Sequence, residues 1–256
     1  MEYSGYGSVE VAQDLFLRYQ RQLHLPEWGR PQQKKLAQTR VLLVGMGGLG
    51  CPVALYLCAA GVGTLGLMDD DVVSMSNLQR QVLYTPEDVG LPKVQVAQRR
   101  LKDFNAEVDL HIIEAPLEAR HGLTHLANFD IIVDCSDNLA VRYLINDACQ
   151  ALNKTWVYGS VYRFEGQVAC FPPEPGCYRC IYPEQPHADV VPSCTEAGVL
   201  GTVPALIAQL QATEVLRLVG QWGPGLDRHL LLADLKSFDF HKLQRPVNRG
   251  CQACGQ

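Results

Sequence analysis

The stretch Val41–Gly50, which reads VLLVGMGGLG, decides the fold of this chain. Its first four residues, Val41–Val44, are apolar and typical of a buried strand. The glycines that follow are Gly45, Gly47, Gly48 and Gly50. A glycine-rich turn between a strand and a helix presents backbone N–H groups at the helix N-terminus, where they bind phosphate oxygens. The stretch therefore predicts a strand, a phosphate-binding loop and a helix.

The wider segment from Val41 to Met68 contains no charged residue and is nominally long enough to cross a bilayer as one helix. Glycines interrupt it repeatedly, and Pro52 follows the densest glycine group, so we reject a membrane span. The segment is instead predicted to form a strand, a buried helix at about 52–60 and a second strand at about 64–68. This is a βαβ unit whose strands are covered on both faces.

The rest of the chain continues the alternation of helical and extended patterns. Helices are expected at 92–104, 138–152 and 198–219, and extended segments at 108–113, 130–134, 155–159, 167–171, 229–235 and 236–241. This order predicts an α/β fold: a doubly wound, Rossmann-like, mostly parallel sheet with a C-terminal extension.

Composition narrows the class of protein. The 256 residues, 47% of them hydrophobic, suffice for one large core. A formal net charge of −5 provides no overall positive field, so we expect neither nucleic acid nor a membrane as partner. Met1–Arg18 lacks the features of a signal peptide, which predicts a cytoplasmic protein. In that reducing compartment, ten cysteines indicate metal binding or catalysis rather than disulfides.

Several polar residues extend the phosphate loop into a predicted nucleotide site. Asp69 ends the second strand, where a carboxylate can accept hydrogen bonds from ribose hydroxyls. Loop and Asp69 alone also fit an NAD-dependent oxidoreductase, but Arg80 and Lys93 add the cations that a triphosphate needs. Asp137 follows a predicted strand and could hold Mg²⁺; alternatively, it only caps the next helix. Together, the phosphate loop and these charged residues favour ATP as the ligand.

Four cysteines form two Cys-x₂-Cys pairs, which predict a structural zinc site with no open coordination position. They are Cys177, Cys180, Cys251 and Cys254. Five others are expected to be small core residues: Cys51, Cys58, Cys135, Cys149 and Cys170. Cys194 precedes a predicted helix whose dipole could favour its thiolate, but an inert buried thiol fits that position equally well.

The sequence resembles the MoeB/ThiF/HesA family of ATP-dependent adenylyltransferases, which are related to ubiquitin-activating enzymes. The matching stretches are Arg18–Gln22, Gly45–Gly50, Ser76–Gln81, Lys93, Asp134–Asn138, Cys177–Cys180, Cys194–Gly198 and Cys251–Cys254. They occur in family order from about Leu17 to the end of the chain. The resemblance implies a single domain with an N-terminal helical segment (1–36), a nucleotide-binding half (37–160) and a carrier-binding and zinc half (161–256), without a rhodanese domain.

The resemblance also implies the activity. ATP would activate the C-terminal glycine carboxylate of a ubiquitin-like sulfur carrier protein ending in Gly-Gly, as an acyl-adenylate with release of pyrophosphate. The implied catalytic residues are Arg21, Arg80, Lys93, Asp137 and Cys194, with Asp137 binding Mg²⁺. The implied nucleotide-binding residues are Gly45, Gly47, Gly48, Gly50, Asp69, Asp71, Ser76, Asn77, Leu78, Gln79, Arg80, Lys93, Asp137 and Asn138.

Partners follow from the same resemblance. A homodimer is implied, in which Arg21 reaches the neighbouring subunit's nucleotide site, and a separate sulfurtransferase or cysteine desulfurase supplies sulfur. Members of the family differ in whether the cysteine matching Cys194 links covalently to the carrier. Two other functions stay open at this stage: an NAD-dependent Rossmann oxidoreductase, and a nucleotide-sensing scaffold that binds a carrier without activating it.

Overall fold

The computed structural model describes residues 17–174, 176–186 and 198–255. Its strands are β1 (Arg40–Val44), β2 (Thr64–Met68), β3 (Asp109–Ile113), β4 (Ile131–Asp134), β5 (Thr155–Tyr162), β6 (Glu165–Phe171), β7 (His229–Asp234) and β8 (Asp239–Gln244). Its helices are α2 (Gly29–Leu36), α3 (Gly50–Ala60), α4 (Lys93–Phe104), α5 (Ala119–Ala127), α6 (Leu139–Ala151), α7 (Tyr178–Ile181) and α9 (Thr202–Gly220), with short 3₁₀ turns η1 (Met75–Asn77) and η2 (Pro86–Asp88). Residues 17–23 are also helical.

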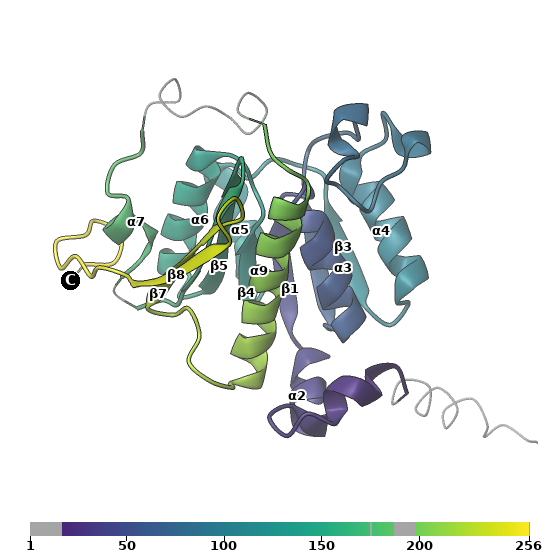
Figure 1. Cartoon of the computed structure of the whole chain (residues 1–256), viewed down its shortest axis with the longest axis horizontal. Helices are drawn as coiled ribbons and strands as arrows, with labels where there is room; N and C mark the ends of the chain where they lie inside the picture. Colours follow the sequence, from purple (N-terminus) through teal and green to yellow (C-terminus); the bar gives the residue numbers. More distant parts are fainter. Residues whose placement is uncertain (1–16, 175, 187–197, 256) are drawn as a thin grey trace, which may run out of the picture.

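The strands form one eight-stranded sheet in the order β3-β2-β1-β4-β5-β6-β7-β8 (Figure 1). Strands β1 to β5 pair in parallel, whereas β5 to β8 pair antiparallel. The predicted mixed α/β fold is confirmed, and the antiparallel strands are the C-terminal extension. The strand order reverses between β1 and β4, and open α/β sheets bind ligands at such a reversal, beyond the carboxyl ends of the strands.

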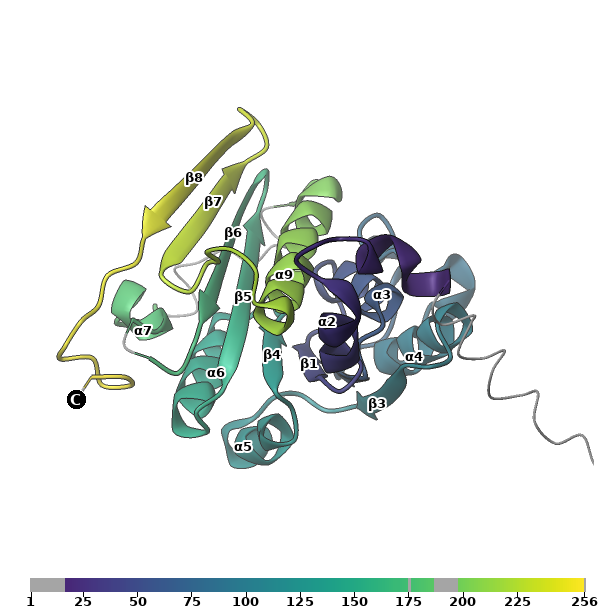
Figure 2. The same cartoon turned by 90° about the horizontal axis from the view of Figure 1, so that it is seen from below.

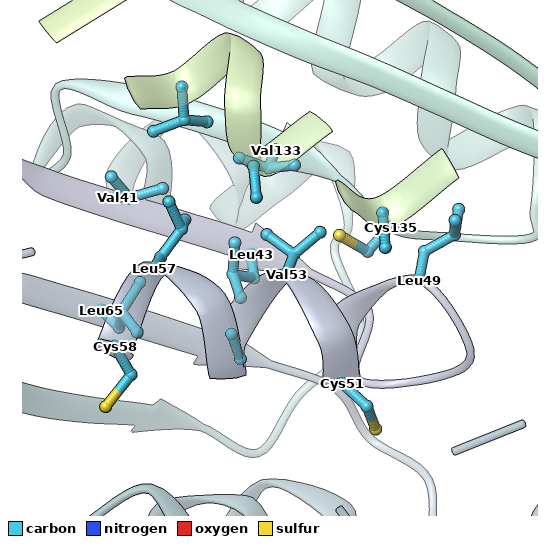
Figure 3. Packing of buried hydrophobic residues seen from close by; sticks show 14 of the residues in the cluster. Val41, Leu43, Leu49, Cys51, Val53, Leu57, Cys58, Leu65, Val133 and Cys135 are labelled. Atoms are coloured by element: carbon cyan, nitrogen blue, oxygen red, sulfur yellow. The ribbon is translucent and has the colours of Figure 1, made fainter. Parts of the chain in front are cut away.

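Helices cover both faces of the sheet (Figure 2). Along β1, Val41 and Leu43 pack into one apolar cluster with residues of α3, α4 and α9. Leu42 and Val44 point the other way, into a second cluster with residues of α5, α6 and α7. In Figure 3, the first cluster is seen between β1 and α3, with Val53 lying over Leu43. Burial on both faces of the sheet explains why the stretch from Val41 to Met68 has no charged residue.

Several elements differ from the sequence predictions. Helix α5 was not predicted, and α9 begins at Thr202 rather than at about 198. Strands β5 and β6 extend to a tight turn at 163–164, where Arg163 adopts a positive φ of 54°. The stretch 41–68 forms β1, α3 and β2, so it is not a transmembrane segment. Among the described residues, we find no helix with the length and apolarity needed to cross a membrane.

Candidate functional site

A cavity of about 310 Å³ opens beyond the carboxyl ends of β1, β2 and β4, at the reversal of strand order. Of the residues predicted to bind a nucleotide, those that line it are Gly45, Gly47, Gly48, Asp69, Asp71, Arg80, Lys93, Asp137 and Asn138. Gly50, Ser76, Asn77, Leu78 and Gln79 are not part of its wall. The fold thus brings together residues from five separate parts of the sequence.

The glycines of the loop between β1 and α3 have two different tasks. Gly45 has a φ of +101°, and a Cβ there would lie 2.7 Å from the carbonyl oxygen of Cys135. A Cβ on Gly50 would clash with the carbonyl of Gly45. In contrast, a Cβ on Gly47 would find its nearest neighbour at 3.5 Å. Gly45 and Gly50 therefore permit the tight turn, whereas Gly47 and Gly48 keep the cavity wall open.

Asp69 closes the cavity at the end of β2. Its side chain, 11% exposed, accepts hydrogen bonds from the backbone N–H of Met46 at 2.6 Å and of Asp71 at 2.8 Å. Burial raises the pKa of Asp69, while the charge of Lys93 opposes that rise. Each carboxylate oxygen has a further lone pair, so the group can still accept a hydrogen bond from a ligand.

Lys93, the first residue of α4, extends its side chain into the same region. Its ammonium group lies 2.7 Å from a carboxylate oxygen of Asp71 and 4.0 Å from one of Asp69. The Lys93 side chain is only 6% exposed, whereas that of Asp71 is 73% exposed. Because Asp71 can turn into solvent, an incoming phosphate can compete for the ammonium group.

Arg80 also lines the cavity and belongs to the segment between β2 and α4. Its aliphatic part packs over Gly48, and its guanidinium donates to the carbonyl oxygen of Ser76 at 3.0 Å. Asn77 accepts a hydrogen bond from the backbone N–H of Ser74, which caps η1, and Gln79 packs against Gly201. In this structure these neighbours shape the loop that carries Arg80.

The loop after β4 supplies the acidic wall. Asp134 is fully buried and accepts hydrogen bonds from the Ser136 hydroxyl at 2.6 Å and the Ser136 N–H at 3.0 Å. Burial raises the pKa of Asp134, while Arg142 opposes that rise. Asp137 is exposed at the cavity. Asn138 caps α6, because its side chain accepts from the N–H of Ala140 at 2.8 Å; the alternative role of Asp137 as that cap is wrong.

Four polar residues that line this cavity were missed as site residues: Asp70, Gln81, Ser136 and Arg142. Arg142 lies 3.4 Å from Asp134 and donates to the carbonyl of Ser136 at 3.2 Å. It also lines a neighbouring cavity of about 570 Å³, together with Tyr158 and Tyr182. The sequence did carry a signal for Arg142, because it lies one turn into α6, shortly after the acidic residues that end and follow β4. Gln81, another of the four, is 3% exposed.

Arg21 does not line this cavity. Its neighbours in the N-terminal helical segment bind to the chain's own body: Tyr19 accepts a hydrogen bond from Asn105 at 3.0 Å, and Gln22 donates to the carbonyl of Ala60 at 2.9 Å. Arg21 itself is exposed. The described residues of one chain therefore do not bring Arg21 to the predicted nucleotide site.

The four predicted zinc ligands meet near the C-terminus. Their sulfur atoms all lie within 4.8 Å of one another, with Cys177 and Cys251 at 3.7 Å and Cys180 and Cys254 at 3.5 Å. A tetrahedral zinc with Zn–S bonds of about 2.3 Å separates its sulfurs by about 3.8 Å, which fits this cluster. Burial acts to raise the pKa of Cys251, but backbone N–H groups outweigh it and lower the pKa to about 7.

The remaining cysteines follow the sequence prediction where the structure describes them. The predicted core cysteines are all buried and unbridged: Cys51, Cys58, Cys135, Cys149 and Cys170. Burial raises the pKa of the Cys51 thiol to about 12 and of the Cys58 thiol to about 11, so neither is a thiolate at neutral pH. Cys194 lies outside the described residues.

Comparisons with known proteins concern the family and the fold of the chain. The profile described as "ThiF family" matches residues 19–253. The "Sulfur carrier protein adenylyltransferase" of Thermus thermophilus is 46% identical over 244 residues, which cover 93% of this chain and 90% of that protein. "Adenylyltransferase and sulfurtransferase MOCS3" of Sus scrofa is 44% identical, and the match covers 96% of this chain but 54% of that protein. The structure of "E. coli MccB + ATP" shares the fold, with a TM-score of 0.80 and 24% identity over 93% of this chain and 74% of that one.

Proposed function

The chain belongs to the ThiF family, and from that premise we propose that it is an ATP-dependent adenylyltransferase for a ubiquitin-like sulfur carrier protein. The carrier's C-terminal glycine carboxylate attacks the α-phosphorus of ATP. A carboxylate oxygen–phosphorus bond forms, the bond to the β-phosphate oxygen breaks, and pyrophosphate leaves. The observation that carries this proposal is one cavity that combines an open glycine loop with three cationic residues and four acidic residues; they are Arg80, Lys93, Arg142, Asp69, Asp70, Asp71 and Asp137.

The expected barrier to this reaction is electrostatic, since an anionic carboxylate must approach an anionic triphosphate. Lys93 and Arg80 line the same cavity as the glycine loop and can neutralise phosphate charge as it shifts towards pyrophosphate. Asp69 is suited to the ribose hydroxyls, because it ends β2 and retains acceptor capacity. A carboxylate is ionised at neutral pH, so the step needs no general base.

Asp137 is the residue that we propose to hold Mg²⁺. It is exposed at the cavity, and among the described residues its carboxylate makes no hydrogen bond or ion pair. One free carboxylate beside phosphates is the usual protein contribution to a Mg²⁺ site, and the ion would offset phosphate charge. Asn138 lines the same wall, but its side-chain oxygen already caps α6.

The carrier's tail must reach the α-phosphate from outside the nucleotide. The 570 Å³ cavity adjoins the nucleotide cavity, and Arg142 lines both. A guanidinium at that junction is suited to a carboxylate. We propose that the Gly-Gly tail lies in this second cavity, with its terminal carboxylate near Arg142.

Arg21 provides the argument for a homodimer. It is exposed, it is absent from the cavity of its own chain, and Tyr19 and Gln22 fix its helical segment to the body. We propose that it completes the cavity of a second copy.

Mixing Arg21→Ala chains with Asp137→Ala chains tests this homodimer. Part of the lost activity should return, because one cavity of the mixed dimer then has both residues. If the two inactive variants stay inactive after they have exchanged subunits, the proposed role of Arg21 is contradicted.

Two further assignments complete the proposal. The cysteine cluster binds zinc as a structural ion, and Cys194 is a candidate for a covalent link to the carrier. Sulfur would come from a separate donor; the name of the longer Sus scrofa relative combines an adenylyltransferase with a sulfurtransferase.

The exchange of labelled pyrophosphate into ATP tests the activity. We expect exchange only when a carrier ending in Gly-Gly is present, and a fall of about a hundredfold or more in Lys93→Met, because phosphate-binding groups of this kind supply several kcal/mol to the transition state. A carrier that lacks its last glycine is the matched control. Tight NAD binding without ATP affinity would instead indicate the oxidoreductase.

A further inference from the structure

Asp134, the last residue of β4, is a buried carboxylate with no part in the proposed chemistry. Its side chain is 0% exposed, and Ser136 donates two hydrogen bonds to one of its carboxylate oxygens. The other oxygen, Oδ2, lies 3.4 Å from Nε of Arg142, and neither of these two atoms has a hydrogen-bond partner among the described residues. A buried charge is costly unless an opposite charge compensates it, so the two side chains depend on each other.

The guanidinium of Arg142 is held by two further groups. Its Nη2 donates to the carbonyl oxygen of Ser136 at 3.2 Å, and its central carbon lies over the ring of Tyr158, 5.5 Å from the ring centre. The Tyr158 hydroxyl in turn donates to the side-chain oxygen of Gln167 at 3.1 Å. Asp134 and Ser136 thus contact Nε and Nη2 while an aromatic ring packs against the guanidinium. Such contacts restrict a side chain that otherwise has many rotamers.

Helix α9 anchors Asp134 from another side. The side-chain amide of Gln211, which is 0% exposed, donates to the backbone carbonyl of Asp134 at 2.7 Å. Gly159 in β5 leaves space for that amide, because a Cβ there would lie 2.3 Å from the amide carbon of Gln211. A glycine within a strand often marks such a close approach. The end of β4 is therefore a fixed support for the guanidinium.

Arg142 is the one residue, among those that the structure describes, that lines both the 310 Å³ and the 570 Å³ cavity. The proposed function brings the carrier's carboxylate to this junction. The N–H donors of a guanidinium lie in one plane, so its orientation decides where a carboxylate can bind. The reaction further requires a carboxylate oxygen in line with the α-phosphorus, and a small misplacement lowers the rate.

We propose that Asp134 is a positioning residue for adenylation, whose buried carboxylate fixes the guanidinium of Arg142 in the orientation that receives the carrier's carboxylate. The inference rests on the proposed function for the identity of that ligand. It goes beyond that function because it assigns a task to a side chain that touches neither substrate.

Asp134→Asn tests the inference, because it keeps an oxygen for the hydrogen bonds from Ser136 and removes only the charge. The variant is compared with Arg142→Met and with the double variant. Asp130→Asn is the matched control, since it breaks the 3.2 Å pair of Asp130 and Arg40 at the opposite end of β4, outside both cavities. Pyrophosphate exchange at varied carrier concentration gives kcat/KM for the carrier, and calorimetry gives ATP affinity.

In Asp134→Asn we expect kcat/KM for the carrier to fall about tenfold, the lower range for a hydrogen bond to a charged group. The lost negative charge alone would strengthen attraction of a carboxylate, so a fall reports lost orientation. ATP affinity should stay within about twofold, as should both quantities in Asp130→Asn. An unchanged or increased kcat/KM in Asp134→Asn would overturn the inference.

The double variant separates positioning from a general structural role. Because Asp134 acts through Arg142, Asp134→Asn should lower kcat/KM by less than about twofold more in a chain that already carries Arg142→Met. Losses that multiply, or a matching loss of ATP affinity, would show that Asp134 only supports the fold and would overturn the inference.

A measurement on the wild-type chain keeps the inference testable if Asp134→Asn does not fold. Heteronuclear NMR of arginine Nε–H groups, with the Arg142 signal assigned by its absence in Arg142→Lys, should show a distinct signal that exchanges slowly with water. A signal that exchanges as fast as those of exposed arginines would overturn the inference.

The two proposals fail differently. A wild-type chain without carrier-dependent exchange would refute the proposed function and, with it, the role of Asp134 in adenylation. A wild-type chain that exchanges normally, together with an unaltered kcat/KM in Asp134→Asn, would refute only the positioning role.

Discussion

At the scale of single residues, one glycine motif serves two physical purposes. Gly45 is required by the backbone, because it combines a φ of +101° with close contact to Cys135. Gly47 is not required by the backbone, because the protein itself leaves room for a methyl group there, and we expect it to matter for a ligand instead. We therefore expect fold and function to depend on different members of the same sequence motif.

Substitution by alanine should separate these purposes. Gly45→Ala should lower the free energy of unfolding by at least about 1–3 kcal/mol, since the new Cβ is strained at this φ and collides with a carbonyl. Gly47→Ala should unfold almost like the wild type in urea but bind ATP more weakly, because its methyl group lies in the cavity wall. Equal stability losses in the two variants would contradict this division.

The residue pattern could predict the loop but not all of its surroundings. The motif identified the phosphate loop, Asp69, Arg80 and Lys93 because strand, turn and charge follow one another locally. It could not reveal the pairing of Lys93 with Asp71, or the position of Arg142 and Gln81 at the cavity, because these depend on how distant elements pack.

At the scale of elements, α4 contacts residues near both ends of the segment 72–92, which carries Arg80. Lys93 is its first residue, and further along the helix Arg99 and Arg100 contact the buried carboxylate of Asp88 at 2.6 and 3.2 Å. The N–H and hydroxyl of Thr85 donate to the same carboxylate at 2.8 and 2.9 Å. This cluster fixes the segment 72–92 against α4.

Asp88 should make stability depend on acid pH. Burial alone would raise its pKa, but the hydrogen bonds from Thr85 and Arg100 outweigh burial and lower the pKa. The carboxylate of Asp88 therefore binds a proton less readily in the folded state than in the unfolded chain, where the pKa of an Asp side chain is about 3.9. Stabilisation by this carboxylate is therefore complete above that value and is lost as pH falls through the lower folded pKa.

Asp88→Asn tests this dependence. At pH 7 the variant should lose about 1–3 kcal/mol of unfolding free energy, because charged hydrogen bonds are weakened. The difference from the wild type should shrink below about pH 4, where the wild-type carboxyl also becomes neutral. Asp103→Asn, an exposed change on the same helix, is the control. A difference that stays constant down to acid pH would contradict the assignment.

Most elements of the parallel half were predictable, because their buried strands form short apolar runs between glycines and charges. Helix α5 was missed, since it is only nine residues long and only Gly122 and Leu126 in it are buried. The predicted start of α9 was too early. Residues 198–201 include apolar residues like those of the helix, but the helical backbone begins only at Thr202.

At the scale of the whole molecule, the cysteine cluster ties the C-terminal end to the loop after β6. Cys177 directly precedes α7 and Cys180 lies within it, while Cys251 and Cys254 follow β8. Arg245 strengthens this tie, because its buried guanidinium donates to the carbonyls of Gly176 and Cys170.

Removal of one ligand should release the metal. Cys177→Ser and Cys254→Ser are expected to lose bound zinc and to unfold at lower temperature, because the closed site stabilises only the folded chain. ATP affinity should persist, since the nucleotide cavity shares no residue with the cluster. Cys149→Ser, a buried thiol outside the cluster, controls for loss of packing alone. Stoichiometric zinc in both ligand variants would refute the site.

The central claim is that this cavity joins AMP to a carrier's C-terminal carboxylate. Intact-mass spectrometry of the carrier after incubation with the chain, ATP and Mg²⁺ tests it most directly. We predict a carrier heavier by one adenylyl group, absent with Lys93→Met and removed by hydroxylamine, as expected of an acyl-adenylate. A carrier of unchanged mass under conditions in which the chain demonstrably binds both ATP and the carrier would contradict the account.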